Sequence, residues 1–136
     1  MASTDMGMYA DDPLGDLGRL KAEMFRAVRL VVDTGMHAKH WSREEAIDYM
    51  RAKTGQTEAE VTREIERYVV WPGQATAYKT GQLAILAARA RAEAALGDTF
   101  DLKEFHETVL GNSAMPLGIL DRVVDDWIAA KKAAAN

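Results

Sequence analysis

Apolar residues recur along most of this chain at intervals of three and four positions, which is the spacing of one face of an α-helix. The pattern is clearest in the first third of the chain, at Leu17, Leu20, Met24, Val28, Val31 and Val32. No segment alternates apolar and polar residues over the length of a strand, and Ala, Leu, Glu, Arg and Lys are abundant. The sequence therefore predicts an all-α fold.

Local start and stop signals divide this pattern into separate helices. The first helix is expected to open near Pro13 or Asp16 and to end at Gly35. Serine, threonine or aspartate followed three positions later by glutamate forms a capping box, and such boxes begin at Ser42, Thr57 and Asp101. The two short helices that start after Ser42 and Thr57 are expected to form an antiparallel helical hairpin.

Two prolines mark the remaining helices. Pro72 is expected to open the longest helix, which would run to about Leu96, and Pro116 to open the last helix. We expect a single bundle of about six helices, with a helical hairpin and one long central helix. The bundle would occupy residues 13–130, between a flexible N-terminal segment at residues 1–12 and a frayed tail at residues 131–136.

Composition and charge narrow the classes of partner. A chain of 136 residues, 48% of them hydrophobic, is of single-domain size and can bury one core. A net charge of −4, with basic and acidic residues interleaved, argues against nucleic acid or an anionic membrane as a partner. The chain has no cysteine, which excludes disulfides and thiol catalysis. No apolar run approaches the roughly 20 residues of a membrane span, and residues 1–12 do not resemble a signal peptide, so we expect a cytoplasmic protein.

The most informative stretch for chemistry is Arg67 to Gln74, where a cation, a phenol, an indole and an amide surround a Pro72-Gly73 break. Helices on both sides would make this break a rigid corner that directs polar side chains into a groove. On helical spacing alone, Tyr68 is expected in the core and Arg67 at the surface.

A second candidate feature is the segment from Asp33 to His37, which the sequence predicts to be a turn around Gly35. Asp33 follows three apolar residues and lies four positions after Arg29, so we expect a buried or half-buried Arg29–Asp33 ion pair that fixes this turn. His37 and His40 do not have the spacing or the additional ligand of a helical metal site, and we expect no metal site in this chain.

Several stretches together resemble one protein family. They are residues 11–20, Arg29-Leu30-Val31-Val32-Asp33-Thr34-Gly35-Met36-His37, residues 41–46, Glu66-Arg67-Tyr68-Val69-Val70-Trp71-Pro72-Gly73-Gln74-Ala75, residues 78–83 and residues 109–112. In order, from about Met6 to Ile128, they resemble the C-terminal part of a large bacterial family described as a domain of unknown function. That family is similar to HExxH zinc peptidases of the gluzincin type.

The resemblance implies a function for the chain. In the family, zinc is held by an HExxH-like helix and by a glutamate on a following helix, both upstream of the matched region, and this sequence contains neither. The chain would then be the substrate-side wall of a peptidase cleft, inactive alone, with zinc implied only for the full-length family. A missing metal-binding half supplied by another chain, a homodimer and a peptide substrate are the implied partners, and export is implied for full-length relatives.

A more distant resemblance, to the angiotensin-converting enzyme class, implies roles for individual residues. Tyr68 would donate to the oxyanion of a tetrahedral intermediate. The substrate-facing residues would be His37, Arg67, Gln74, Tyr78 and Lys79, with Lys79 meeting a peptide carboxylate. Two alternatives stay open: a non-enzymatic helical module that associates through an exposed apolar face, and a small-ligand pocket at the corner without catalysis.

Overall fold

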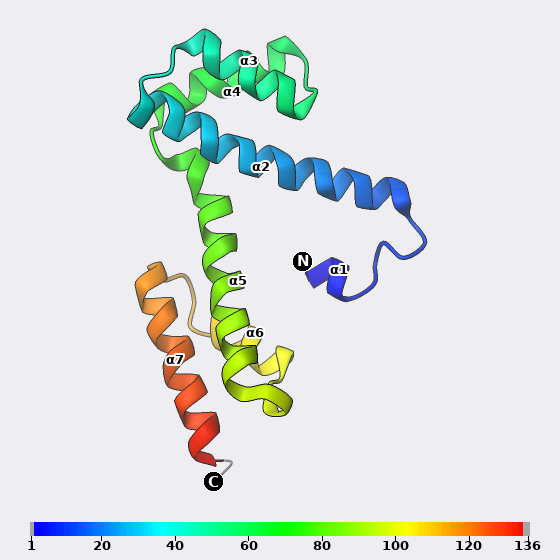
Figure 1. Cartoon of the computed structure of the whole chain (residues 1–136), viewed down its shortest axis with the longest axis vertical. Helices are drawn as coiled ribbons and strands as arrows, with labels where there is room; N and C mark the ends of the chain where they lie inside the picture. Colours follow the sequence, from blue (N-terminus) through cyan, green and yellow to red (C-terminus); the bar gives the residue numbers. More distant parts are fainter. Residues whose placement is uncertain (1, 135–136) are drawn as a thin grey trace. The chain divides into compact units, whose positions relative to one another are not determined.

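The computed structural model describes residues 2–134 of the chain, and the regular secondary structure in that range consists of helices joined by turns and loops, without strands (Figure 1). The α-helices are α1 (Ala2–Asp5), α2 (Pro13–Lys39), α3 (Arg43–Thr54), α4 (Glu58–Val70), α5 (Ala77–Leu96), α6 (Leu102–Leu110) and α7 (Leu117–Ala134). Two short 3₁₀-helices, η1 (Gln74–Thr76) and η2 (Gly97–Thr99), flank α5. The predicted all-α class is confirmed.

The helices form two compact units, one up to Thr80 and one from Gly81 onward, whereas the sequence predicts a single bundle. Each unit has its own buried cluster. The first cluster comprises Val28, Val32, Ala46, Ile47, Met50, Val61, Ile65, Tyr68 and Ala75. The second comprises Ala88, Ala92, Leu96, Phe105, Leu120, Val124 and Ile128. Helical periodicity shows that each helix has a buried face, but it does not show which helices share a core.

In the first unit, the α3–α4 hairpin packs against α2 (Figure 1). The two capping boxes predicted for this unit are present: the side chains of Ser42 and Thr57 accept from the third residue of their helices, and Glu45 and Glu60 accept in return. Gly55 ends α3 in the left-handed conformation, with φ of 65°. These signals are local, which explains why the sequence alone predicts the hairpin correctly.

The predicted stop at Gly35 is wrong, because α2 continues to Lys39 and residues 33–37 are helical rather than a turn. His40 ends the helix instead, with φ of 57°. Gly35 is required for another reason. A Cβ at this position would lie 2.5 Å from Cε3 of Trp41, so only glycine lets the indole pack against the helix. The glycine is a packing site and not a helix end.

The predicted helix start at Pro72 is also wrong. Helix α4 ends at Val70, Gly73 adopts φ of 82°, and α5 begins at Ala77 after the short η1. The longest helix is therefore α2, with 27 residues, and not α5, with 20. Pro72 and Gly73 form a sharp corner because proline cannot continue the hydrogen bonds of α4 and glycine tolerates positive φ.

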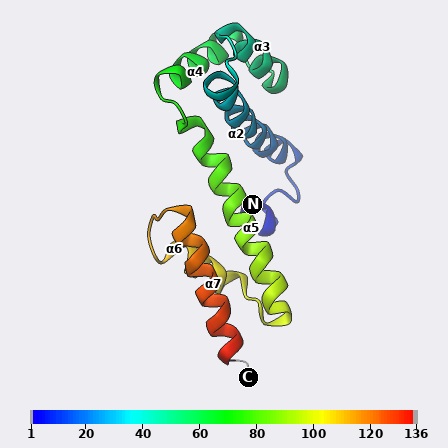
Figure 2. The ribbon, with the colours of Figure 1, turned by 60° about the vertical axis from the view of Figure 1, so that its left-hand side comes forward.

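In the second unit, α6 and α7 pack together and share the buried cluster with α5 (Figures 1 and 2). Asp101 caps α6, accepting from the backbone N–H groups of Lys103 at 2.7 Å and Glu104 at 3.1 Å, which is the N-cap half of the capping box predicted there. Helix α7 extends to Ala134, and residues 135–136 of the predicted tail lie outside the described part of the chain. Between residues 2 and 134, no helix has the length and apolarity needed to cross a lipid bilayer.

Candidate functional site

The corner between α4 and η1 is attached to α2 by a buried carboxylate. Asp33, which is 2% exposed, accepts from the backbone N–H of Gly73 through both oxygens, at 3.0 and 3.1 Å. Arg29 and Asp33 are both buried as predicted, but the predicted ion pair between them is not formed. The Asp33 carboxylate instead accepts from the backbone N–H of Gly73.

Arg29 lies in a largely aromatic environment and is 8% exposed. Its guanidinium carbon is 5.7, 5.4 and 5.3 Å from the ring centres of Phe25, Tyr68 and Tyr78. Cations are attracted to aromatic faces at such distances. Nη2 of Arg29 donates to Oε1 of Gln74 at 3.1 Å, whereas the buried Nε has no hydrogen-bond partner.

Tyr68 has no exposed surface, as its helical position predicts. Its hydroxyl donates to Oε2 of Glu64 at 2.5 Å. Burial, and then the hydrogen bond to Glu64, raise the pKa of Tyr68 well above its usual range, so the phenol keeps its proton. The oxyanion-donor role predicted for Tyr68 does not fit this arrangement, because the hydroxyl is enclosed and already has an acceptor. Its part in the corner is to hold the neighbouring groups in position.

Glu64 connects Tyr68 with Arg67, whose Nη2 donates to the same carboxylate oxygen at 2.8 Å. Burial opposes ionisation of Glu64, but the hydrogen bonds from Arg67 and Tyr68 outweigh it and lower the pKa of the carboxyl group. Nη1 of Arg67 donates to Oε1 of Gln74 at 2.9 Å. Arg67 is half-buried and forms an ion pair with Glu64. Its guanidinium is therefore held between Glu64 and Gln74 and does not extend freely into solvent.

The other predicted site residues lie around this group. Nε2 of the exposed His37 donates to the backbone carbonyl of Tyr68 at 3.0 Å, which joins the end of α2 to the end of α4. Tyr78 is 55% exposed, and its ring also lies 5.7 Å from the guanidinium of Arg26. Nζ of Lys79 is 3.2 Å from Oε1 of Glu23, so this predicted carboxylate-binding cation has a carboxylate of the chain as its partner.

The structure thus joins Arg29, Arg67, Tyr68 and Gln74, which were selected from the sequence, into one hydrogen-bonded group with Glu64, which was not selected. Glu64 lies three positions before Arg67 and four before Tyr68, a spacing that brings side chains together on a helix. That spacing was the sequence signal that could have identified Glu64 as a member of the group. Of the rings around Arg29, Phe25 lies four positions earlier on the same helix, whereas Tyr68 and Tyr78 come from segments far along the chain and had no such signal.

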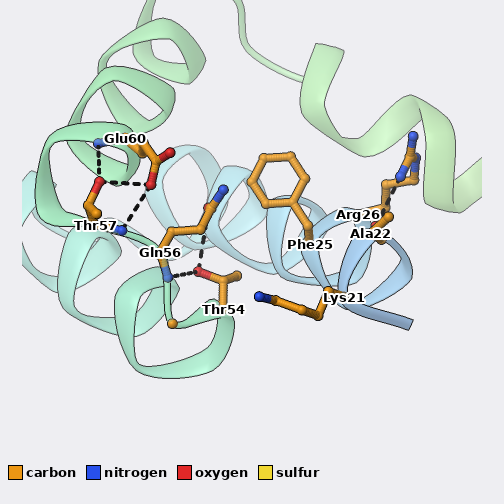
Figure 3. Close-up of a pocket in the computed structure, with 9 residues that line it drawn as sticks. Lys21, Ala22, Phe25, Arg26, Thr54, Gln56, Thr57 and Glu60 are labelled. Carbon is orange, nitrogen blue, oxygen red and sulfur yellow. Dashed lines mark hydrogen bonds between the residues drawn. The ribbon is translucent and has the colours of Figure 1, made fainter. Parts of the chain in front are cut away.

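A separate cavity of about 450 Å³ lies between α2 and the turn that joins α3 to α4 (Figure 3). Figure 3 shows the Phe25 ring between the polar side chains of the turn and those of α2. The lining of this cavity contains none of the site residues predicted from the sequence; it comprises Lys21, Ala22, Phe25, Arg26, Thr54, Gly55, Gln56, Thr57 and Glu60. Sequence reasoning missed this cavity, since it depends on how the hairpin packs on α2.

The family resemblance implies zinc, which would need a group of ligating side chains. Within residues 2–134, no three histidine, cysteine, aspartate or glutamate side chains are grouped so that they could hold a metal ion. Zinc requires three or four such ligands at about 2.0–2.3 Å. The described residues therefore do not fit a zinc ion by themselves.

These features define an all-α protein with a buried arginine and a polar corner between two helices. The chain belongs to a bacterial family described as "Bacterial protein of unknown function (DUF885)", whose model matches residues 2–124. This confirms the predicted family, while the likeness to zinc peptidases stays a prediction. No curated protein matches the sequence.

A solved structure extends the comparison. It is described as "The crystal structure of the putative lipoprotein from Colwellia psychrerythraea" and is 57% identical in sequence, with a TM-score of 0.92. The match covers 95% of this chain but only 22% of the Colwellia chain. This chain thus corresponds to about a fifth of that longer protein.

Proposed function

We propose that this chain forms the substrate-binding side of a zinc-peptidase-like hydrolase. The observation that carries this proposal is the fixed polar corner at which His37, Arg67 and Gln74 lie at or near the surface. Asp33 and Glu64 hold the corner in place through hydrogen bonds. A substrate-positioning surface requires such rigidity, because misplacement by about 1 Å can lower rates by about 100-fold.

The chemistry of the corner suits a peptide. Guanidinium groups donate in a planar fork that matches carboxylate and carbonyl oxygens. The amide of Gln74 can both donate to and accept from a peptide backbone. The exposed side chains of Val70 and Trp71, 72% and 59% exposed, offer apolar contact beside these polar groups. Binding and orientation are the contributions that these residues make, and the metal chemistry of the proposed hydrolase belongs to other polypeptide.

That other polypeptide is part of the proposal. Most of the Colwellia protein lies outside the match with this chain. We place the zinc ligands of the hydrolase in such additional sequence, joined to this region in one chain or brought to it by a partner chain. The resemblance to HExxH peptidases supports this assignment.

A chimera tests the proposed function. This chain would replace the matched segment of the Colwellia protein, and release of amino groups from acetylated peptides would be measured with zinc present. Arg67→Gln in the chimera is expected to lower kcat/KM at least about tenfold, since a lost charge-assisted contact is worth about 1.4 kcal/mol or more. Arg63→Gln removes an exposed charge from the same helix and is expected to leave kcat/KM unchanged.

Two results would contradict the proposal. The first is a folded parent protein and a folded chimera, both loaded with zinc, that cleave no peptide. The second is a hydrolytic chimera in which Arg67→Gln and Arg63→Gln have the same kcat/KM. Circular dichroism and melting curves would establish that each variant is folded.

A second candidate function, association without catalysis, is favoured by an apolar face on α2. Leu14, Leu17, Leu20 and Met24 recur on one side of the helix and are 79%, 53%, 48% and 50% exposed. Exposed apolar patches of this kind commonly form interfaces. This proposal predicts a homodimer in light scattering that Leu17→Glu converts to a monomer. Ala22→Glu, with the same added charge elsewhere on α2, should leave the dimer intact, and a wild-type monomer at millimolar concentration would contradict the idea.

The cytoplasmic location predicted from residues 1–12 is a separate proposal. The Colwellia relative is described as a lipoprotein, a statement about that protein and its own chain. Fractionation of cells that produce the protein is the direct measurement. Recovery in the cytoplasmic fraction is expected, and recovery with membranes or periplasm would contradict the prediction.

A further inference from the structure

We propose that the point between Arg29 and Arg67 binds the C-terminal carboxylate of a peptide, with the Gln74 side chain occupying that point in the absence of ligand. The assignment of a peptide rests on the proposed function, whereas the assignment of a carboxylate rests on the geometry of the corner. The predicted carboxylate partner was Lys79, which instead pairs with Glu23.

The two guanidinium groups converge on one neutral atom. Oε1 of Gln74 accepts from Nη2 of Arg29 at 3.1 Å and from Nη1 of Arg67 at 2.9 Å. Two cations directed at the same point are better matched by an anion than by an amide, because hydrogen bonds to an ionised acceptor are roughly twice as strong. The position of the amide oxygen therefore marks a site for a negatively charged oxygen.

The two carboxylates nearest in the corner, Glu64 and Asp33, have other hydrogen-bond donors. Glu64 accepts from Nη2 of Arg67, the other terminal nitrogen of that guanidinium, and from the Tyr68 hydroxyl. Asp33 accepts a hydrogen bond from the backbone N–H of Gly73. Arg29 keeps a buried Nε–H without any partner. A buried donor left unpaired is unusual in folded proteins and is costly unless a ligand fills it.

The two arginines are also held in place for binding. Arg29 is 8% exposed and lies against the rings of Phe25, Tyr68 and Tyr78. The guanidinium of Arg67 lies 4.9 Å from the centre of the Tyr68 ring. Because neither guanidinium has to be ordered on binding, the entropy cost of recognition is reduced.

Gln74, in contrast, can be displaced. It is an exposed residue in a short 3₁₀-helix, and its side chain is attached to the corner by hydrogen bonds from the two arginines. An incoming carboxylate would replace the amide oxygen, and the released amide would be free to meet the peptide backbone. The exposed ring of Tyr78 beside Arg29 would then contact the terminal side chain of the peptide.

A nuclear magnetic resonance titration of the 136-residue chain tests this inference. The probes are N-acetyl-dialanine as the free acid, the same compound as its C-terminal amide, and an acetylated aspartate amide that carries only a side-chain carboxylate. The free acid is expected to shift the Arg29 Nε–H signal and the Gly73 and Gln74 amide signals. The C-terminal amide should shift none of them, and the aspartate amide should bind at least tenfold more weakly than the free acid.

Matched variants separate the site from general electrostatics. Arg67→Gln is expected to weaken binding of the free acid at least tenfold, and Arg63→Gln to leave it unchanged. Gln74→Ala removes the competing amide oxygen and should keep or strengthen binding. Equal binding of acid and amide, or equal effects of Arg67→Gln and Arg63→Gln, would overturn the inference.

This experiment contains no zinc and no reaction, so its result is independent of hydrolysis. Selective binding of the free acid by a chain whose chimera cleaves nothing would contradict the hydrolase proposal and leave the carboxylate site standing. A hydrolytic chimera combined with equal binding of acid and amide would contradict the carboxylate site alone.

Discussion

Removal of the Asp33 carboxylate tests whether the corner is held to α2 as described. Asp33 is 2% exposed and is the acceptor for the Gly73 N–H. Asp33→Ala removes a hydrogen bond to a charged group, which contributes about 1.5–3 kcal/mol, and also opens a small void. We expect Asp33→Ala to lower the free energy of unfolding of the first unit by about 2–3 kcal/mol. Asp33→Asn keeps an oxygen acceptor but loses the charge, so its expected cost is about 1 kcal/mol.

Tryptophan fluorescence during urea unfolding measures this effect. Trp41 packs 5.3 Å from Tyr49 in the first unit, whereas Trp127 contacts Phe100 in the second. A Trp127→Phe background therefore restricts the signal to the first unit. The matched control is Asp48→Asn, at an exposed carboxylate on α3, for which a change within about 0.5 kcal/mol is expected.

The result that would refute the reasoning is specific. If Asp33→Ala lowered the free energy of unfolding no more than Asp48→Asn, the carboxylate would not anchor the corner. The proposed function would then lack the rigid corner on which it depends. A further sign of anchoring is the carboxylate titration: Asp33→Ala should weaken binding of the free acid without changing the acid-to-amide preference, because the arginines remain.

Three other changes have expected outcomes. Gly35→Ala should lower the free energy of unfolding by about 1–3 kcal/mol in urea titrations, because a Cβ would meet the Trp41 ring; an unchanged midpoint would contradict the packing role. Gly73→Ala should cost about 1–2 kcal/mol, since φ is 82° there, and stability equal to wild type would show that the corner is not strained for alanine. The pKa of Glu64 is lowered from 4.5 in the folded chain, so its ionised form contributes stability above about pH 4.5 that is lost as the pH falls through the folded value. Glu64→Gln should therefore be less stable than wild type at pH 7, with the difference shrinking in acid melts; a difference independent of pH would exclude this linkage.

Local sequence signals predicted the parts of the fold that depend on neighbouring residues. The capping residues Ser42, Thr57 and Asp101 begin α3, α4 and α6 as expected. Each cap acts within one helical turn, so its effect is readable from a few adjacent positions. The burial of Tyr68 followed in the same way from helical spacing.

The failures have the opposite cause, since they depend on residues distant in sequence or on packing. Gly35 has the sequence features of a helix end, but its real neighbour is the Trp41 ring beyond the end of α2. Asp33 has an arginine at helical spacing, but its carboxylate accepts from the backbone N–H of Gly73, 40 positions later. A backbone N–H exposed by a proline corner is a stronger requirement than an intrahelical ion pair, and the sequence does not show where that N–H lies.

The same limit applied to the candidate site. The sequence placed Arg67 and Gln74 at one corner without pairing them, and the structure shows them hydrogen-bonded to each other and, through Gln74, to Arg29. It selected Tyr68 for a catalytic role through a resemblance, and burial of the phenol argues for a positioning role instead. Which polar groups share a point in space is decided by the packing of α2 on α4.

The most direct measurement is the rate at which the zinc-loaded chimera cleaves an acetylated peptide that ends in a free carboxylate, compared with the same peptide as an amide. Faster cleavage of the free acid, with the advantage lost in Arg67→Gln and kept in Arg63→Gln, is the predicted result. No cleavage of either peptide by the folded, zinc-loaded parent protein and chimera would contradict the assignment of this chain to the substrate side of a hydrolase.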